Sequence, residues 1–248
     1  MSLVSIVTPA YNAERFVGAA IESVRAQTHP DLEMLVVDDV STDATAAVVE
    51  RHAAEDARVR LLRRAANGGP AASRNTALEA AAGRWIAFLD SDDAWLPDKL
   101  EAQLRFMEST GAPFTYTRYR RIDEEGEFLS GVVAVPDRLD YDDLLGNTAI
   151  VTSSVLIDRA ATGDFRMRDV YYDDFACWLE LLKRGHVAHG VQQDLTRYRV
   201  LARSWSRNKL RSAWKVWRTY RDIEQLGLPR SASAFVRYAA NALRKQRV

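Results

Sequence analysis

The 248-residue sequence predicts an α/β fold in which a mostly parallel central sheet is flanked by helices. Three observations lead to this prediction. Short apolar runs alternate with stretches of helical periodicity over the first half of the chain, which is typical of βαβ units with right-handed crossovers. Hydrophobic residues make up 47% of the chain, enough for a substantial core. Two apolar runs end in aspartates, and the carboxyl ends of strands are where open α/β sheets bind ligands.

Four strands and three helices are expected in the N-terminal half. The strands are short apolar runs bounded by turn residues, and the helices have apolar residues at helical spacing. Ser41, Thr42 and Asp43 offer N-cap residues for the second helix. The expected strands are residues 3–8, 32–37, 59–62 and 85–89. The expected helices are residues 14–27, from the cap at 41–43 to about 54, and 71–82.

The pattern is less regular in the C-terminal half. A hairpin turn is expected at 124–127 between strands that cover 114–135, and a short helix within the irregular segment 137–150. We therefore expect a main domain, residues 1–208, followed by a basic amphipathic helical extension, residues 209–248. The remaining expected elements are helices at 97–109, 173–184, 208–225 and 231–246, and a strand at 152–157.

The zero net charge of the chain hides an asymmetry. Residues 197–248 hold 14 Lys and Arg but two acidic residues, whereas the rest of the chain holds 20 basic and 32 acidic residues. In this tail Trp214, Trp217 and Tyr220 recur at helical spacing beside basic residues. Such a helix suits an anionic membrane surface, but packing of its apolar stripe on the main domain explains it equally well. No nucleic-acid motif accompanies the charge, so no nucleic acid partner is expected.

The expected strand at 85–89 ends in three carboxylates, those of Asp90, Asp92 and Asp93. Carboxylates at one strand end repel one another, and a divalent cation is the simplest group that relieves this. Mg²⁺ and Mn²⁺ prefer oxygen ligands, and Mg²⁺ commonly combines one or two carboxylates with substrate phosphates. The cluster therefore indicates a metal–phosphate site, and the alternative is a solvated turn or a cap of the following helix.

Two further strand ends should open on the same edge of the sheet. Thr8, Pro9, Ala10 and Tyr11 follow the first strand, and Asp39 follows the second. An aromatic ring, a carboxylate and a metal-binding pair outline a pocket for a nucleoside diphosphate. The phosphate-binding glycine motifs G-x-x-x-x-G-K-[ST] and G-x-G-x-x-G are absent. A basic residue would then help the metal, and Arg74 is placed for it, although Tyr11 covering an edge and Arg74 pairing on a helix surface remain alternatives.

These segments together resemble the inverting glycosyltransferases of family 2, which have the GT-A (nucleotide-diphospho-sugar transferase) fold. The resemblance covers about residues 3–208 and is specific for the family, but it says little about the sugar. The matching segments are Ser5–Asn12, Leu35–Asp39 with Ser41–Asp43, Asn67–Asn75, Ala82–Asp93, Tyr172–Leu179, and Tyr198-Arg199 with Ser204 and Ser206.

The resemblance implies a role for each residue of the nucleotide-sugar site. Arg74 would lie near the base or the diphosphate, and Asp90 and Ser91 would lie at the ribose end of the aspartate motif. Asp92 would bind Mn²⁺ or Mg²⁺ across the diphosphate, and Asp93 would orient the sugar or the loop. The nucleoside, usually uridine, would be held by Thr8, Pro9, Ala10, Tyr11 and Asp39.

The resemblance also implies that Asp174 is the catalytic base. An acceptor hydroxyl needs a carboxylate to take its proton during in-line attack. The alternative is that Asp173 and Asp174 cap the helix that follows, with favourable placement in the helix dipole. Two departures stand out: the family more often has Glu at position 173, and it often carries His where Val200-Leu201-Ala202 stand here.

The expected activity is transfer of a sugar with inversion, from a UDP-sugar to a glycan or lipid-linked glycan acceptor in surface-polysaccharide synthesis. The absence of a signal-peptide pattern and the single cysteine, Cys177, lead us to expect a cytoplasmic protein on the inner face of the membrane. Two alternatives stay open. A sugar nucleotidyltransferase would want similar groups but also a basic glycine-rich loop after the first strand. A non-catalytic membrane-associated subunit would not need Asp92 and Asp174.

Overall fold

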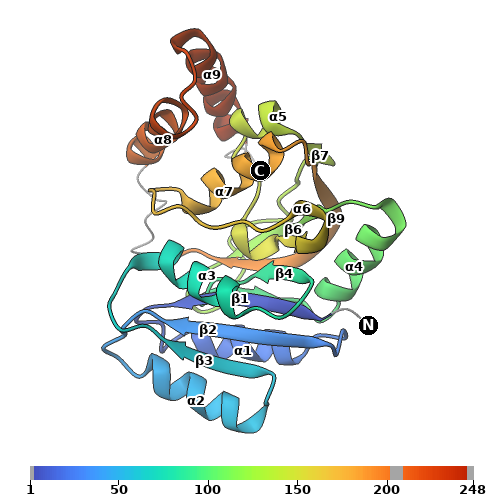
Figure 1. The fold of residues 1–248 in the computed structure, drawn as a ribbon, viewed down its shortest axis with the longest axis vertical. Helices are drawn as coiled ribbons and strands as arrows, with labels where there is room; N and C mark the ends of the chain where they lie inside the picture. The colour runs from blue at the N-terminus through green and yellow to red at the C-terminus, as the bar shows by residue number, and fades with distance from the viewer. Residues whose placement is uncertain (1–2, 202–208, 245–248) are drawn as a thin grey trace.

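The computed structural model describes residues 3–201 and 209–244, and within them a nine-stranded sheet runs through the molecule (Figure 1). Eight strands follow the order β3-β2-β1-β4-β8-β6-β9-β5, and the short β7 pairs with β9 outside this path. The strands are β1 (Val4–Ala10), β2 (Leu32–Asp38), β3 (Val59–Arg63), β4 (Trp85–Phe88), β5 (Ala94–Trp95), β6 (Phe114–Ile122), β7 (Arg138–Leu139), β8 (Leu156–Asp158) and β9 (Ala188–Arg199).

Helices cover both faces of this sheet (Figure 1). A 3₁₀ turn, η1, and a π-helical turn, η3, interrupt the regular α-helices in the C-terminal half. The helical elements are α1 (Val17–Arg25), α2 (Thr45–Glu55), α3 (Gly69–Ala80), α4 (Lys99–Thr110), α5 (Tyr141–Leu145), η1 (Thr152–Ser154), α6 (Arg159–Thr162), α7 (Asp173–Lys183), α8 (Lys209–Arg218), η3 (Thr219–Ile223) and α9 (Leu228–Arg244).

The N-terminal half forms the parallel sheet that the sequence predicts. Strands β1 to β4 are mutually parallel where they pair, and each begins and ends within two residues of its predicted bounds. Because side chains alternate along a strand, β4 contributes to two cores. Trp85 and Ala87 join the core beneath α1, α2 and α4, whereas Ile86 and Phe88 join the core beneath α3 and α7. The carboxyl ends of β2, β1 and β4 therefore lie side by side.

The C-terminal half departs from the prediction in three places. Residues 152–157 form the η1 turn before β8 rather than one strand, and β8 runs antiparallel to β4. The expected second strand of the 114–135 hairpin is reduced to two isolated bridges, Tyr119–Val133 and Ile122–Phe128. The longest strand, β9, was not predicted, because polar residues from Gln192 to Asp194 break its alternation, and the β6–β9 register shifts around Arg118.

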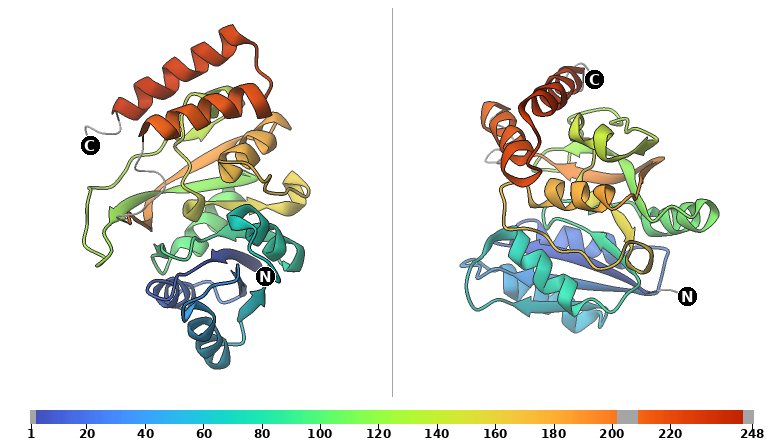
Figure 2. Two further views of the ribbon diagram at one scale, coloured as in Figure 1. Left: turned by 90° about the vertical axis from the view of Figure 1, so that its left-hand side faces the viewer. Right: turned by 45° about the horizontal axis from the view of Figure 1, so that its top comes forward.

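The extension packs on the main domain beside α5 and α7, at the end of the molecule opposite β3 (Figure 2). Val216, Tyr220 and Ala234 are buried in the same core as α3 and α7, and the Tyr220 hydroxyl donates a hydrogen bond to the Leu145 carbonyl. Trp214, by contrast, is 57% exposed. The packing interpretation of the apolar stripe thus holds for Tyr220 and not for Trp214. None of the helices in the described ranges combines the length and the apolar character needed to cross a bilayer.

Candidate active site

The turn after β1 presents one aromatic side chain to solvent. Thr8 and Ala10 are buried within β1, and Pro9 between them is partly exposed. The Thr8 hydroxyl is buried and has no hydrogen-bond partner among the described residues. Tyr11 follows with 53% of its surface exposed, and Asn12, with a φ of 47°, turns the chain away. Tyr11 is therefore the residue of this turn that a planar ligand could reach most easily.

Asp39, at the end of β2, fixes the loop before α3. Its carboxylate accepts hydrogen bonds from the amides of Gly68 (3.1 Å) and Gly69 (2.7 Å) and from the Arg64 guanidinium (2.7 Å). Its own carbonyl accepts a bond from the Asn67 side chain at 2.9 Å. The carboxylate is almost fully buried. In this structure Asp39 acts on the neighbouring loop, and a nucleoside group would have to share oxygens that already accept three bonds.

Arg74 does not pair on a helix surface but lies buried between the carboxylates of Asp90, after β4, and Asp173, at the start of α7. Its Nη2 is 2.6 Å from Asp90 Oδ1 and its Nη1 is 2.6 Å from Asp173 Oδ2. Burial opposes the charge, but Asp90, Asp173 and Asp174 outweigh it and raise the pKa of Arg74. Its Nε has no partner among the described residues. Arg74 thereby links the aspartate motif after β4 to the first turn of α7.

The aspartate motif divides into a partly exposed half and a buried half. Asp90, Ser91 and Asp92 are partly exposed, whereas Asp93 is buried. Asp93 accepts a hydrogen bond from the Ser153 hydroxyl at 2.5 Å and one from the Arg199 amide at 2.7 Å. Of the two roles considered for Asp93, orienting the loop is the one that these contacts support, since they tie the motif to η1 and β9.

Asp92 has the surroundings expected of a metal ligand. Burial, and after it the charge of Asp90, raise the pKa of Asp92 to about 6. The two carboxylates repel each other, and a cation between or beside them would remove this cost. The available donors are carboxylate oxygens, which suit Mg²⁺ or Mn²⁺ rather than a thiol-preferring metal. The residues present therefore fit a divalent cation held by Asp92.

Asp174 faces a different environment from its neighbour. The N-cap residue of α7 is Tyr172, which forms no side-chain cap bond, whereas Asp173 and Asp174 lie in the first turn and the Asp174 carboxylate accepts a hydrogen bond from the Phe175 amide at 2.7 Å. Asp173 is engaged by Arg74, whereas Asp174 accepts a hydrogen bond from the Thr152 hydroxyl at 2.6 Å. Burial, and after it the charge of Asp173, raise the pKa of Asp174. A raised pKa makes this carboxylate a stronger proton acceptor than an exposed aspartate.

Asp90 and Asp174 line the same cavity, which has a volume of about 240 Å³. Larger hollows of about 520 and 560 Å³ elsewhere in the described part of the chain contain none of the predicted site residues. The two carboxylates, joined behind the cavity by Arg74 and Asp173, thus flank one space. Its other lining residues are mostly aromatic or apolar, among them Tyr172, Phe175, Trp178, Tyr198 and Tyr238.

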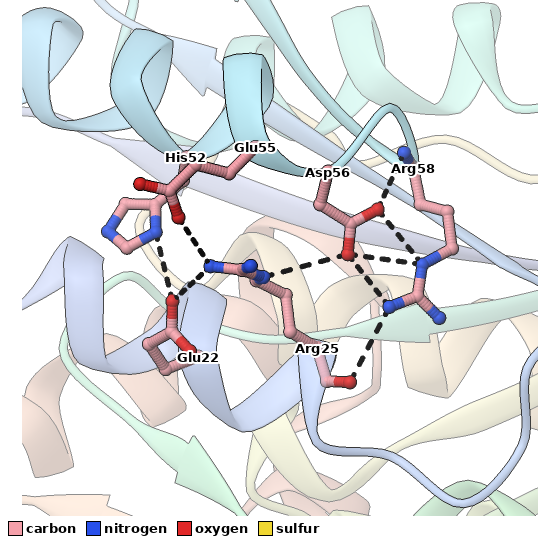
Figure 3. Close-up of polar contacts among 6 residues, drawn as sticks. All are labelled: Glu22, Arg25, His52, Glu55, Asp56 and Arg58. Carbon is pink, nitrogen blue, oxygen red and sulfur yellow. Dashed lines mark hydrogen bonds and ion pairs between the residues drawn. The ribbon is translucent and has the colours of Figure 1, made fainter.

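A second group of potential metal ligands lies far from this site, between α1 and α2. Glu22, His52 and Glu55 bring their ligand atoms within 4.8 Å of one another. The Arg25 guanidinium occupies this space, at 2.6 Å from Glu22 and 3.0 Å from Glu55, and Asp56 lies beyond it (Figure 3). Since arginine keeps its charge at neutral pH, the group is an ion-pair network that joins two surface helices.

Comparison with known proteins agrees with this geometry. The profile of the Glycosyl transferase family 2 matches residues 5–156. The putative teichuronic acid biosynthesis glycosyltransferase TuaG of Bacillus subtilis is 42% identical over 245 residues, which cover 98% of this chain and 97% of TuaG. The chain belongs to glycosyl transferase family 2. Membership in this family decides against the sugar nucleotidyltransferase that the sequence left open.

Other relatives of this family 2 glycosyltransferase extend the comparison. The Escherichia coli UDP-Glc:α-D-GlcNAc-diphosphoundecaprenol β-1,3-glucosyltransferase WfgD is 37% identical over 229 residues, covering 92% of this chain and 89% of WfgD. S. aureus TarS residues 1–349, solved with UDP-GlcNAc, superposes with a TM-score of 0.73 at 17% identity, covering 96% and 72% of the two chains. The Pyrobaculum calidifontis mannosyltransferase PcManGT, solved with GDP-Man and Mn²⁺, has a TM-score of 0.71 at 20% identity, covering 98% and 70%. These neighbours confirm the GT-A fold.

Some parts of the glycosyltransferase site could not be read from the sequence. Thr152 and Ser153, which bond Asp174 and Asp93, lie in a segment that was assigned to a strand. The available signal was a run of hydroxyl residues where a buried strand should begin. Where a His was missing from the expected loop, Val200 donates its amide to Ile122 and continues the sheet. Ser204 and Ser206 lie outside the described residues.

Proposed function

We propose that this family 2 glycosyltransferase moves a sugar, with inversion at the anomeric carbon, from a UDP-sugar to a glycan hydroxyl. The acceptor would be a lipid-linked glycan of surface-polysaccharide synthesis at the cytoplasmic face of the membrane. The names of two relatives support a UDP-sugar donor and a lipid-linked acceptor: WfgD is named for UDP-Glc and a diphosphoundecaprenol-linked GlcNAc, and TuaG is a putative teichuronic acid biosynthesis glycosyltransferase.

The proposed site residues divide the work as follows. The acceptor hydroxyl gives its proton to Asp174 while its oxygen attacks the anomeric carbon and the bond to the diphosphate breaks. Asp92 would hold a divalent cation, which stabilises the negative charge on the leaving diphosphate. Arg74 keeps Asp173 engaged, so Asp174 is left to face the acceptor, and Tyr11 would cover the base.

One observation carries the proposal. Arg74 bonds Asp90 and Asp173 at 2.6 Å each, and Asp90 and Asp174 line one cavity, which supports the proposal. A metal-binding carboxylate on the donor side and a basic carboxylate on the acceptor side are the minimum set for this reaction. Asp92 and Asp174 are the candidates for these two roles, which supports an enzyme over a non-catalytic subunit.

The metal assignment is tested by replacing Asp92 with alanine. Asp92→Ala should abolish transfer and remove the Mn²⁺-dependent part of UDP binding, because the proposed ligand is lost. Calorimetric titration of UDP with and without Mn²⁺ measures this, and a thermal-shift panel of UDP-sugars identifies the donor. Asp98→Ala, at an exposed carboxylate six residues away, is the matched control and should leave UDP binding unchanged. Metal-dependent affinity that survives in Asp92→Ala would remove Asp92 from the metal site.

The extension has a surface that fits an anionic membrane. Trp214, Leu228 and Val236 expose 57%, 62% and 67% of their surfaces. Residues 197–248 hold fourteen basic residues and two acidic ones, and both acids are paired, Asp222 with Arg218 and Glu224 with Lys183. Exposed apolar side chains among basic ones are what an interfacial helix presents to anionic lipid.

Vesicle cosedimentation tests this surface. The full chain should bind anionic vesicles, release them as salt rises, and bind neutral vesicles weakly, because the attraction is electrostatic. The double variant Leu228→Ser with Val236→Ser should bind less at every salt concentration while keeping the wild-type melting temperature. Equal binding to neutral and anionic vesicles would contradict the proposal.

A further inference from the structure

The cavity beside Asp174 receives one wall from the C-terminal extension. Its lining comes mainly from the segment 144–152, from the start of α7 and from β9. Tyr238, on α9, is the one residue of the described extension among them. A helix that the sequence assigns to a separate appendage thus contributes a side chain to the space in which the proposed base lies.

The position of α9 is fixed by specific contacts. The Asn241 side chain donates a hydrogen bond to the Gly146 carbonyl at 2.9 Å. A Cβ atom at Gly146 would come within 3.0 Å of Arg237, so the helix approaches this loop as closely as glycine allows. Phe235 packs between the rings of Trp217 and Tyr238, with centroids 5.7 and 5.9 Å away. Tyr238 is therefore held at the cavity by the packing of its own helix.

The chemistry of the cavity suits a single sugar ring. Its volume of about 240 Å³ lies below the roughly 300–1,000 Å³ of sites for drug-sized ligands. Tyr172, Tyr198 and Tyr238 supply rings that can cover the apolar C–H face of a pyranose and hydroxyls that can bond its rim. Trp178, also in the wall, has a buried indole N–H without a partner among the described residues.

We infer that α9 completes the acceptor subsite, with Tyr238 packing against the acceptor sugar whose hydroxyl faces Asp174. Tyr238 is then a specificity-determining residue, and the extension is part of the enzyme's acceptor recognition. The inference rests on the proposed function, since it takes Asp174 as the base. It also gives α9 two roles, because Val236 on the same helix faces solvent while Tyr238 faces the cavity.

The test separates acceptor binding from donor binding. The probes are the UDP-sugar that wild type prefers and, as acceptor, GlcNAc-diphosphate carrying a short alkyl chain. Tyr238→Ala should raise the acceptor KM by about tenfold or more, the effect of losing a packed aromatic face. Metal-dependent UDP binding and UDP-sugar hydrolysis without acceptor should stay at wild-type values. Tyr238→Phe, which keeps the ring, should have an acceptor KM within about threefold of the wild-type value. Ser233→Ala, at an exposed position of α9, is the control and should have the wild-type acceptor KM.

Two results would overturn the inference. One is an acceptor KM for Tyr238→Ala within twofold of wild type. If that variant does not fold, Tyr238→Leu keeps the bulk without the aromatic face, and an unchanged KM there is the second. A wild-type protein that neither binds UDP with Mn²⁺ nor hydrolyses any UDP-sugar would contradict the proposed function instead, so the two failures are distinguishable.

Discussion

Two arginines of this protein each join acidic side chains from different elements, in opposite surroundings. Arg74 joins Asp90 and Asp173 with its side chain 7% exposed, and Arg25 joins Glu22 and Glu55 with its side chain 26% exposed (Figure 3). The contact distances are alike, between 2.6 and 3.0 Å. Burying a charge costs free energy unless its partners are held in place, whereas solvent screens the surface network. Similar contact distances therefore occur both in the candidate active site, at Arg74, and in a surface ion-pair network, at Arg25.

The largest effect is expected from breaking the buried bridge. Arg74→Gln should destabilise the protein by about 3–5 kcal/mol, because it leaves the buried Asp173 and the partly exposed Asp90 without their counter-charge. Transfer should be lost as well, since the aspartate motif and α7 are no longer tied together. Urea unfolding followed by tryptophan fluorescence measures the first effect. A loss of less than about 1 kcal/mol in the free energy of unfolding would be typical of a surface ion pair and would contradict the difference proposed between Arg74 and Arg25.

The smallest effect is expected from the same substitution at the surface. Arg25→Gln should leave the urea midpoint and the transfer rate close to wild type, because water replaces the lost contacts of Glu22 and Glu55. It is the matched control for Arg74→Gln, with the same chemical change made in a screened network. A marked fall in the urea midpoint would show that the ion-pair network between α1 and α2 stabilises the fold, and it would contradict the difference proposed between Arg25 and Arg74.

The same contrast explains what the sequence could reveal. The strand ends that carry Tyr11, Asp39 and Asp90 were predictable, because buried parallel strands are apolar and their polar ends share one edge. The partner of Arg74 was not, because Asp173 lies 99 residues away and local patterns carry no information on such pairs. In the same way, the sequence does not distinguish Asp93 from Asp92. The difference comes from the hydrogen bonds that Asp93 accepts from Ser153 and Arg199.

The C-terminal half was harder for a physical reason. β9 pairs with three other strands, β5, β6 and β7, so its stability comes from neighbours and not from an alternating pattern of its own. The extension was predicted as helices, yet neither the contact of Tyr220 with Leu145 nor the place of Tyr238 followed from their periodicity. The division into a catalytic domain and an extension stays a prediction. Val216 and Tyr220 of the extension are buried in the same core as residues of α3 and α7.

We propose that Asp174 takes the acceptor's proton, whereas Asp173 forms an ion pair with Arg74. Asp174→Asn keeps the size of the side chain and its bond to Thr152 but removes the proton-accepting carboxylate. The decisive measurement is the transfer rate of this variant at saturating donor and acceptor, beside its affinity for UDP with Mn²⁺. We predict a rate lower by about 10²–10⁴-fold with unchanged UDP affinity. A rate within a few-fold of wild type would contradict it and assign the base to another residue.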